Sequence, residues 1–131
     1  MLRYTDHMGL VISTRSAEAA AHYAEGVQLL ISGSPAVIPV LQAALAADPS
    51  LGVVLIAIAM TRFDAAPPTR ADLDLLEYAL AASSSATRRE RQHIEIVMVA
   101  LHGDLARARA LGAGHLTEFP DDALIRHLVG R

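Results

Sequence analysis

Two stretches of this chain, which lie 70 residues apart, carry the same pattern of helix breakers. Gly33 and Gly103 each follow a run with helical periodicity, and each precedes a second helical run that closes beside a proline, at Pro49 and Pro120. The glycine and the proline are 16 residues apart in the first stretch and 17 in the second. A repeat period near 35 residues with this pattern is typical of stacked helical hairpins, in which two antiparallel helices form one unit.

Capping residues and breakers predict where the helices begin and end. The expected helices cover residues 17–32, 35–47, 51–63, 70–82, 88–102 and 105–118, and a short helix follows Asp121 or Asp122. Pro39 lies inside the second range and is expected to bend that helix or to delay its start. Side chains that can accept a hydrogen bond from the first helical turn precede the first six ranges, and these candidate N-caps are Ser16, Ser34, Ser50, Thr69, Thr87 and Asp104.

The third expected helix has an unusual composition. Residues 53–60 are all apolar, so a helix here would be buried on every side, although the β-branched residues in this run would also suit a buried strand. We expect one domain over residues 1–131, with an extended segment at 1–15, including 10–12, and helical hairpins at 16–131. The predicted fold class is all-α, a short right-handed solenoid of about three antiparallel hairpins with six to seven helices.

Composition narrows the function classes. The formal net charge is −3, and Glu90 and Glu95 interrupt the cluster of Arg88, Arg89 and Arg91, so we expect no nucleic-acid partner. The chain has no cysteine, which excludes thiolate catalysis and zinc–thiolate sites. No signal peptide is evident in residues 1–16, and the run 53–60 is too short to span a bilayer. We therefore predict a cytoplasmic protein without a membrane partner.

Several phrases in the sequence resemble a known family of helical-repeat proteins. The most distinctive is the run 87–93, Thr-Arg-Arg-Glu-Arg-Gln-His, followed by Gly103 and Asp104. With Asp6, Gly9, Ser13, Thr14, Ser16, Ala21, His22, Tyr23 and Gly26, these residues make the chain similar to the opening of the tetratricopeptide-repeat protein 38 family. The resemblance implies a tetratricopeptide-like (TPR-like) fold over nearly the whole chain and implies no catalytic residue.

An inner groove follows from the TPR-like arrangement if Gly26, Ala57 and Ile96 are the positions of closest helix packing. The groove would then be mostly apolar, and its lining would be Tyr23, Val27, Leu30, Val54, Ile58, Thr61, His93, Val97 and Ala100. Such a concave surface would suit an amphipathic helix of a partner protein or an apolar small molecule. Alternatively, the groove is closed in the native state by the chain's own terminus or by a second copy of the chain.

The remaining polar candidates give weaker predictions. The six histidines, His7, His22, His93, His102, His115 and His127, show no i, i+4 pair on one expected helix, so no metal site, cofactor or catalytic residue is predicted. His22 and His93 occupy corresponding regions of two hairpins and could face each other across the groove. Glu90 is expected to form ion pairs with arginines of its own helix or of the next hairpin.

The sequence therefore predicts a non-enzymatic protein–protein interaction module that forms a homodimer and holds a partner on an apolar concave face. The residues expected to bind the partner are Tyr23, Val27, Val54, Ile58, His93 and Val97. The alternative is a small-molecule-binding or accessory protein, or an enzyme, that uses the same groove with His22, His93 and Tyr23 as its polar groups.

Overall fold

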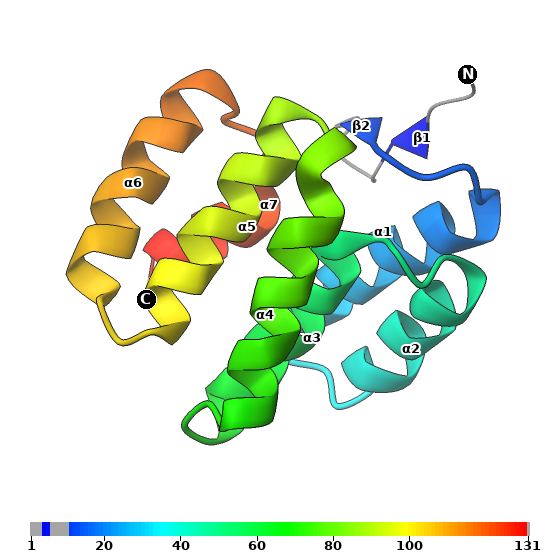
Figure 1. Ribbon diagram of the computed structural model, residues 1–131, viewed down its shortest axis with the longest axis horizontal. Helices are drawn as coiled ribbons and strands as arrows, with labels where there is room; N and C mark the ends of the chain where they lie inside the picture. Colours follow the sequence, from blue (N-terminus) through cyan, green and yellow to red (C-terminus); the bar gives the residue numbers. More distant parts are fainter. Residues whose placement is uncertain (1–3, 6–10, 131) are drawn as a thin grey trace.

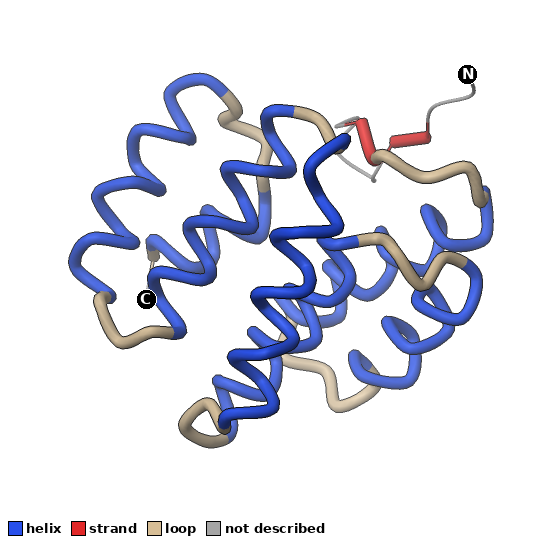
Figure 2. The backbone as a smooth tube through the Cα atoms, viewed as in Figure 1, coloured by secondary structure: helices blue, strands red, loops and turns tan. Residues whose placement is uncertain are grey.

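The computed structural model describes residues 4–5 and 11–130, and most of these residues are helical (Figure 1, Figure 2). The α-helices are α1 (Ala17–Ile31), α2 (Val37–Ala47), α3 (Gly52–Ala65), α4 (Arg70–Ala82), α5 (Arg88–Leu101), α6 (Leu105–Glu118) and α7 (Ala123–Val129), and a 3-10 turn, η1 (Ser83–Ser85), follows α4. Two short strands, β1 (Tyr4–Thr5) and β2 (Val11–Ile12), pair antiparallel. The predicted all-α class is confirmed. Leu10 of the expected extended stretch, and Asp6 and Gly9, lie outside the described residues.

Consecutive helices pack as pairs, with α1 on α2, α3 on α4 and α5 on α6 (Figure 1). Helix α3 occupies the centre, where it also contacts α2 and α5. Residues 51–60 are all buried. The apolar run is therefore a helix surrounded by other helices, and the alternative of a buried strand is wrong.

The two glycines of the repeated pattern end their helices in the same way. Gly33 has φ +76° and Gly103 has φ +97°, a left-handed conformation that favours glycine. The amide of Ser34 donates to the carbonyl of Leu29, and the amide of Asp104 donates to the carbonyl of Val99. Both ends therefore form the same Schellman C-cap, in which two main-chain hydrogen bonds close the helix around the glycine.

Side-chain caps begin most of the predicted helices. Thr69 and Thr87 each form a complete capping box with the acidic residue three positions later. Two of the predicted N-caps, Ser34 and Ser50, are wrong. Ser34 accepts a hydrogen bond from the amide of Ala36, and α2 begins after Ala36 without a side-chain cap. The amide and hydroxyl of Ser50 both donate to Asp48, and α3 begins after Leu51 without a side-chain cap. Helix α2 begins at Val37, which puts Pro39 in the first turn, where a missing amide hydrogen breaks no helical bond.

Helix α7 packs against α1, α5 and α6. The contact with α6 needs a glycine, because a Cβ at Gly112 would lie 2.6 Å from Cγ2 of Val129. Asp122 caps α7, and Leu124, Ile125 and Leu128 are buried. A short helix thus joins the first and third helical pairs. Among the described helices, none combines the length and apolar character needed to cross a membrane.

Candidate functional site

The six residues predicted to bind a partner on the concave face lie in the core of the chain. None of them exposes more than 4% of its surface, and they are Tyr23, Val27, Val54, Ile58, His93 and Val97. Helix α7 contacts two of the three helices that carry them, α1 and α5. In this structure a partner cannot reach the six side chains, so the predicted partner surface is corrected to a part of the core. The alternative in which the chain itself closes the groove describes the observed packing.

His93 is held by a carboxylate that the sequence analysis did not connect with it. Its Nδ1 lies 3.0 Å from Oδ2 of Asp122, at the start of α7. His22, the other histidine considered for the groove, is half-buried on α1. Within the described residues Nε2 of His93 has no hydrogen-bond partner. The polar group of His93 thus serves the docking of α7 and does not open into a groove.

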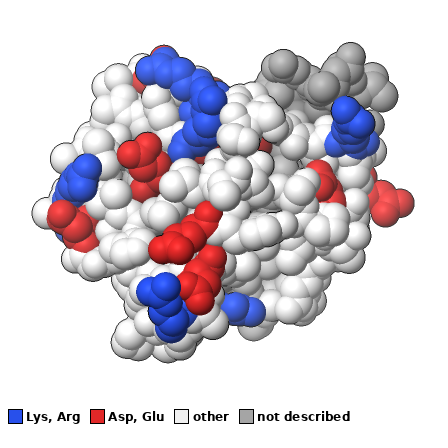
Figure 3. Space-filling view, viewed as in Figure 1, with Lys and Arg blue, Asp and Glu red and all other residues white. Residues whose placement is uncertain are grey.

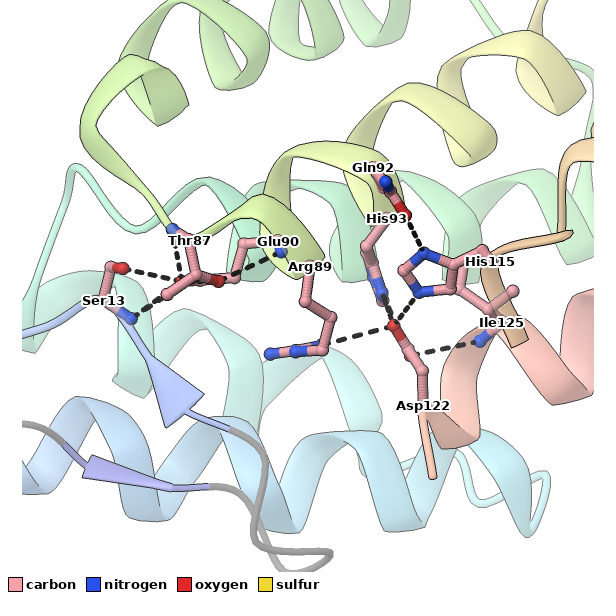
Figure 4. A network of polar contacts seen from close by, with 9 residues as sticks. All are labelled: Ser13, Thr87, Arg89, Glu90, Gln92, His93, His115, Asp122 and Ile125. Atoms are coloured by element: carbon pink, nitrogen blue, oxygen red, sulfur yellow. Dashed lines mark hydrogen bonds and ion pairs between the residues drawn. The ribbon is translucent and has the colours of Figure 1, made fainter. Parts of the chain in front are cut away.

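Asp122 is the centre of a buried polar network (Figure 4). Besides His93, it accepts a hydrogen bond from Nε2 of His115 at 2.8 Å and lies 3.3 Å from Nη1 of Arg89. The side chains of these four residues are between 0% and 5% exposed. Asp122 also caps α7 through the amide of Ile125. One carboxylate therefore joins α5, α6 and α7.

The protonation state of Asp122 follows from its surroundings. Burial alone would raise the pKa of this carboxyl group, because an ion is costly to keep away from water. The attraction of His93, hydrogen bonds from His115 and His93, and the charge of Arg89 oppose burial and outweigh it. The pKa of Asp122 is therefore held well below the ordinary range of aspartate, and the group is an ionised carboxylate at neutral pH.

His115 connects this buried network to the surface. The amide of Gln92 satisfies its neighbours when its nitrogen donates to Nδ1 of His115 at 2.8 Å, the reverse of the orientation drawn in Figure 4. Its oxygen then accepts from Nε and Nη2 of Arg88, at 3.3 Å each. In this arrangement Nδ1 of His115 is an acceptor and Nε2–H is the donor to Asp122. A continuous chain of hydrogen bonds thus runs from Asp122 through His115 and Gln92 to Arg88.

The network does not form a metal centre within the described residues, where no group of three or more His, Cys, Asp or Glu could hold a metal ion. The reason is chemical, because the ring nitrogens of His93 and His115 that face Asp122 donate protons to it and present no lone pair. Nδ1 of His115 is occupied as well, because it accepts the hydrogen bond from the amide of Gln92.

A groove with a volume of about 630 Å³ lies between α5 and α6, and we call it the α5–α6 groove. Helix α5 contributes Arg88, Gln92, Glu95 and Ile96, and α6 contributes Leu111, Gly114, His115, Thr117 and Glu118. His115 and Ile96 are buried in its floor, whereas Leu111 is 39% exposed. The groove therefore combines an apolar pair with a polar floor that is tied to Asp122.

Only some of the charged side chains that line the groove form ion pairs with each other. Arg88 forms an ion pair with Glu118 across the two helices. Glu95 is exposed and, among the described residues, has no ion-pair or hydrogen-bond partner. Figure 3, viewed from the side on which α5 and α6 lie next to each other, shows acidic and basic side chains over this pair. One arginine and two glutamates line the groove, which gives its charged side chains a net charge of −1.

Glu90 has a structural role that differs from the predicted one. Its side chain is buried and accepts hydrogen bonds from the hydroxyl of Ser13 at 2.6 Å and from the hydroxyl of Thr87 at 3.0 Å. The amide of Ser13 donates to the same carboxylate. The expected ion pairs with arginines are replaced by these bonds, which hold the segment after β2 against the start of α5.

Comparison of the chain with protein families gave no matching family, and neither the curated proteins nor the solved structures compared with it gave a match.

Four of the residues that form the site were not predicted from the sequence: Arg89, Gln92, His115 and Asp122. One local signal was present, since Arg89 and His93 are four residues apart and so share a face of α5. The decisive contact is not local. His115 meets Asp122 only because the chain turns after Glu118 and brings the start of α7 back against α6.

Proposed function

We propose that this chain is a small, non-enzymatic TPR-like interaction module that binds a segment of a partner protein in the α5–α6 groove. The observation that carries the proposal is the groove itself, which has a floor of buried His115 and Ile96 and polar residues along its rim. Its volume of about 630 Å³ lies within the range of about 300–1,000 Å³ that is common for ligand sites. A floor fixed by Asp122 keeps this shape before any ligand arrives.

The TPR-like part of the proposal is supported by the three successive helical pairs and by the two identical C-caps 70 residues apart. A right-handed turn of the pairs, as in a solenoid, and membership of the tetratricopeptide-repeat protein 38 family remain part of this proposal. The partner site differs from the one expected on the inner face, because the six residues predicted to bind there are buried. The outer surface of the third pair is the binding surface in this proposal.

Self-association in the cytoplasm also remains a proposal, and α2 offers the surface for it. Residues 26–47 contain no charged side chain. Ala36, Pro39, Gln42 and Ala46 of this segment are exposed. The cores of protein interfaces are depleted of charge, so two copies could pack here without burying an ion. Light scattering on the purified chain tests this, with a dimer expected for the native chain and a monomer for Ala46→Glu.

A small molecule in the same groove is the second candidate, favoured by the buried floor that His115 and Ile96 form. Both candidates share the site and differ in the size of the ligand. A peptide would extend beyond the groove along α5 and α6, whereas a small molecule would be contained by the nine lining residues.

Blocking the groove tests the proposed function. Gly114 is exposed in the groove, and a Cβ there would meet nothing within 4 Å, so Gly114→Trp fills the groove without disturbing the core. The matched control is Ala113→Trp, at the exposed neighbouring position that does not line the groove. Peptides selected on the native chain from a random displayed library should bind the Ala113→Trp variant and lose at least tenfold in affinity for Gly114→Trp. Equal binding to both variants, or no enrichment at all, would overturn the proposal.

A further inference from the structure

The hydrogen-bonding groups of the α5–α6 groove are unequally occupied. The amide nitrogen of Gln92 is engaged by His115, and the hydroxyl of Thr117 donates to the carbonyl of Gly114 at 2.7 Å. The guanidinium of Arg88 is engaged by Glu118 and by the oxygen of Gln92. These donors of the lining therefore already have acceptors. A ligand can find a hydrogen-bond acceptor in the groove, chiefly the exposed carboxylate of Glu95.

The apolar part of the groove adds a second requirement. Ile96 in the floor and Leu111 on the opposite helix form a surface that a flexible alkyl chain can cover. Side chains that carry a cation at the end of an alkyl stem satisfy both needs, because the stem covers apolar surface while the charged end reaches a carboxylate. Arginine fits better than lysine, since its planar guanidinium can donate two parallel hydrogen bonds to one carboxylate.

We propose that the α5–α6 groove recognises an arginine side chain of the partner peptide, with its guanidinium at Glu95 and its stem between Ile96 and Leu111. This inference rests on the proposed function and adds the chemistry of the ligand to it. The net charge of −1 on the lining favours a cation over an anion of the same shape. The Arg88–Glu118 ion pair closes one end of the groove and leaves Glu95 as the acceptor beside the apolar pair.

The experiment compares a cationic, a neutral and an anionic ligand, each of which carries a short alkyl chain, and the cation and the neutral ligand have the same shape. The native chain is titrated with n-butylguanidinium, with its neutral isostere n-butylurea and with n-butyrate, and binding is followed by the backbone amide of Gly114 and the side-chain amide of Gln92 in NMR spectra. We expect n-butylguanidinium to bind at least threefold more tightly than n-butylurea, and n-butyrate to bind least. Equal binding of the cation and its neutral isostere, or tighter binding of n-butyrate, would overturn the inference.

Two variants assign the charge effect to one residue. Glu95→Gln keeps the shape of the side chain and removes its charge. The affinity for n-butylguanidinium should fall about two- to fivefold, as expected for an exposed ion pair, and the affinity for n-butylurea should stay unchanged. Glu25→Gln, an exposed glutamate on α1, is the control and should change neither affinity. An unchanged affinity of Glu95→Gln for the cation would contradict the assignment to Glu95.

The source of the cation is tested with acetyl-Gly-Arg-Gly-amide. Tighter binding of this peptide than of n-butylguanidinium supports a peptide side chain as the ligand, whereas equal or weaker binding favours a free alkyl cation and overturns the peptide source. Failure of the inference can be told from failure of the proposed function. If selected peptides lose affinity for the Gly114→Trp variant and yet bind no more tightly when they contain arginine, the groove is the binding site, and only the proposed ligand class is wrong.

Discussion

Nε2 of His115 lies 2.8 Å from Oδ2 of Asp122, and this contact joins the last turn of α6 to the first residue before α7. The same carboxylate meets His93 and Arg89 of α5. The position of α7, and with it the floor of the α5–α6 groove, therefore depends on one buried anion.

Asp122→Asn should be one of the most destabilising substitutions in this chain. The amide keeps the shape of the side chain but removes the charge that Arg89, His93 and His115 surround. Loss of one partner of a buried charged network costs about 3–5 kcal/mol of unfolding free energy. Urea denaturation measures the unfolding free energy. The control is Asp121→Asn at the exposed neighbouring position, whose unfolding free energy should stay within about 0.5 kcal/mol of that of the native chain. Equal losses in the two variants would contradict the central role of Asp122.

The low pKa of Asp122 predicts how stability depends on pH. In the unfolded chain this carboxyl group takes up its proton near its ordinary pKa of about 4. In the folded chain it resists protonation, so its contribution to stability is complete above pH 4 or so and is lost as the pH falls below that value. Unfolding free energies measured between about pH 2 and pH 6 should fall more steeply for the native chain than for Asp122→Asn. Parallel curves would contradict the assignment.

Glu90→Gln should loosen the segment after β2. The carboxylate accepts from the amide and hydroxyl of Ser13 and from Thr87, and an amide can replace only one of its two oxygens as an acceptor. We expect a loss of about 1–3 kcal/mol and faster hydrogen exchange at the amide of Ser13. The control is Glu95→Gln on the exposed side of the same helix, which should leave this exchange unchanged. Unchanged exchange at Ser13 in the Glu90 variant would mean that these bonds do not hold the segment.

Alanine substitutions at two glycines of the third helical pair should change the stability of the chain in opposite directions. Gly103 has φ +97°, so Gly103→Ala places a side chain in a left-handed conformation and should destabilise the chain by about 1 kcal/mol. Gly114 lies inside α6 with open space around it, so Gly114→Ala should stabilise the chain by up to about 1 kcal/mol. Thermal unfolding of both variants distinguishes them. Shifts of the same sign would contradict the roles given to these residues.

The sequence was sufficient to predict the helices and most of their ends, because local chemistry sets those ends. Three helices begin at side-chain caps that the sequence predicts, which are Thr69, Thr87 and Asp104. Gly103 ends another helix through its left-handed backbone conformation. Ser50 failed as a cap because the nearby carboxylate of Asp48 competes for its hydroxyl and amide. Propensity and spacing do not resolve such competition between neighbouring side chains.

The site could not be predicted in the same way. Tyr23, Ile58 and His93 have the spacing of an inner face, but all three are buried, and α7 packs against the helices that carry Tyr23 and His93. The α5–α6 groove depends on how two helices approach each other over Ile96 and Leu111. The partnership of His115 with Asp122 depends on the turn between α6 and α7. Each of these is a tertiary relationship that no local pattern in the sequence encodes.

The most direct test of the account asks which surface a bound peptide contacts. A peptide enriched on the native chain is titrated into isotopically labelled protein, and NMR shifts are recorded for groove and core residues. We predict changes at the side-chain amide of Gln92, the backbone amide of Gly114 and the methyl groups of Leu111, with the methyl groups of Val54 and Ile58 unchanged. Changes at Val54 and Ile58 with Gln92 and Gly114 unmoved would contradict it and would return the binding surface to the inner face of the helical pairs.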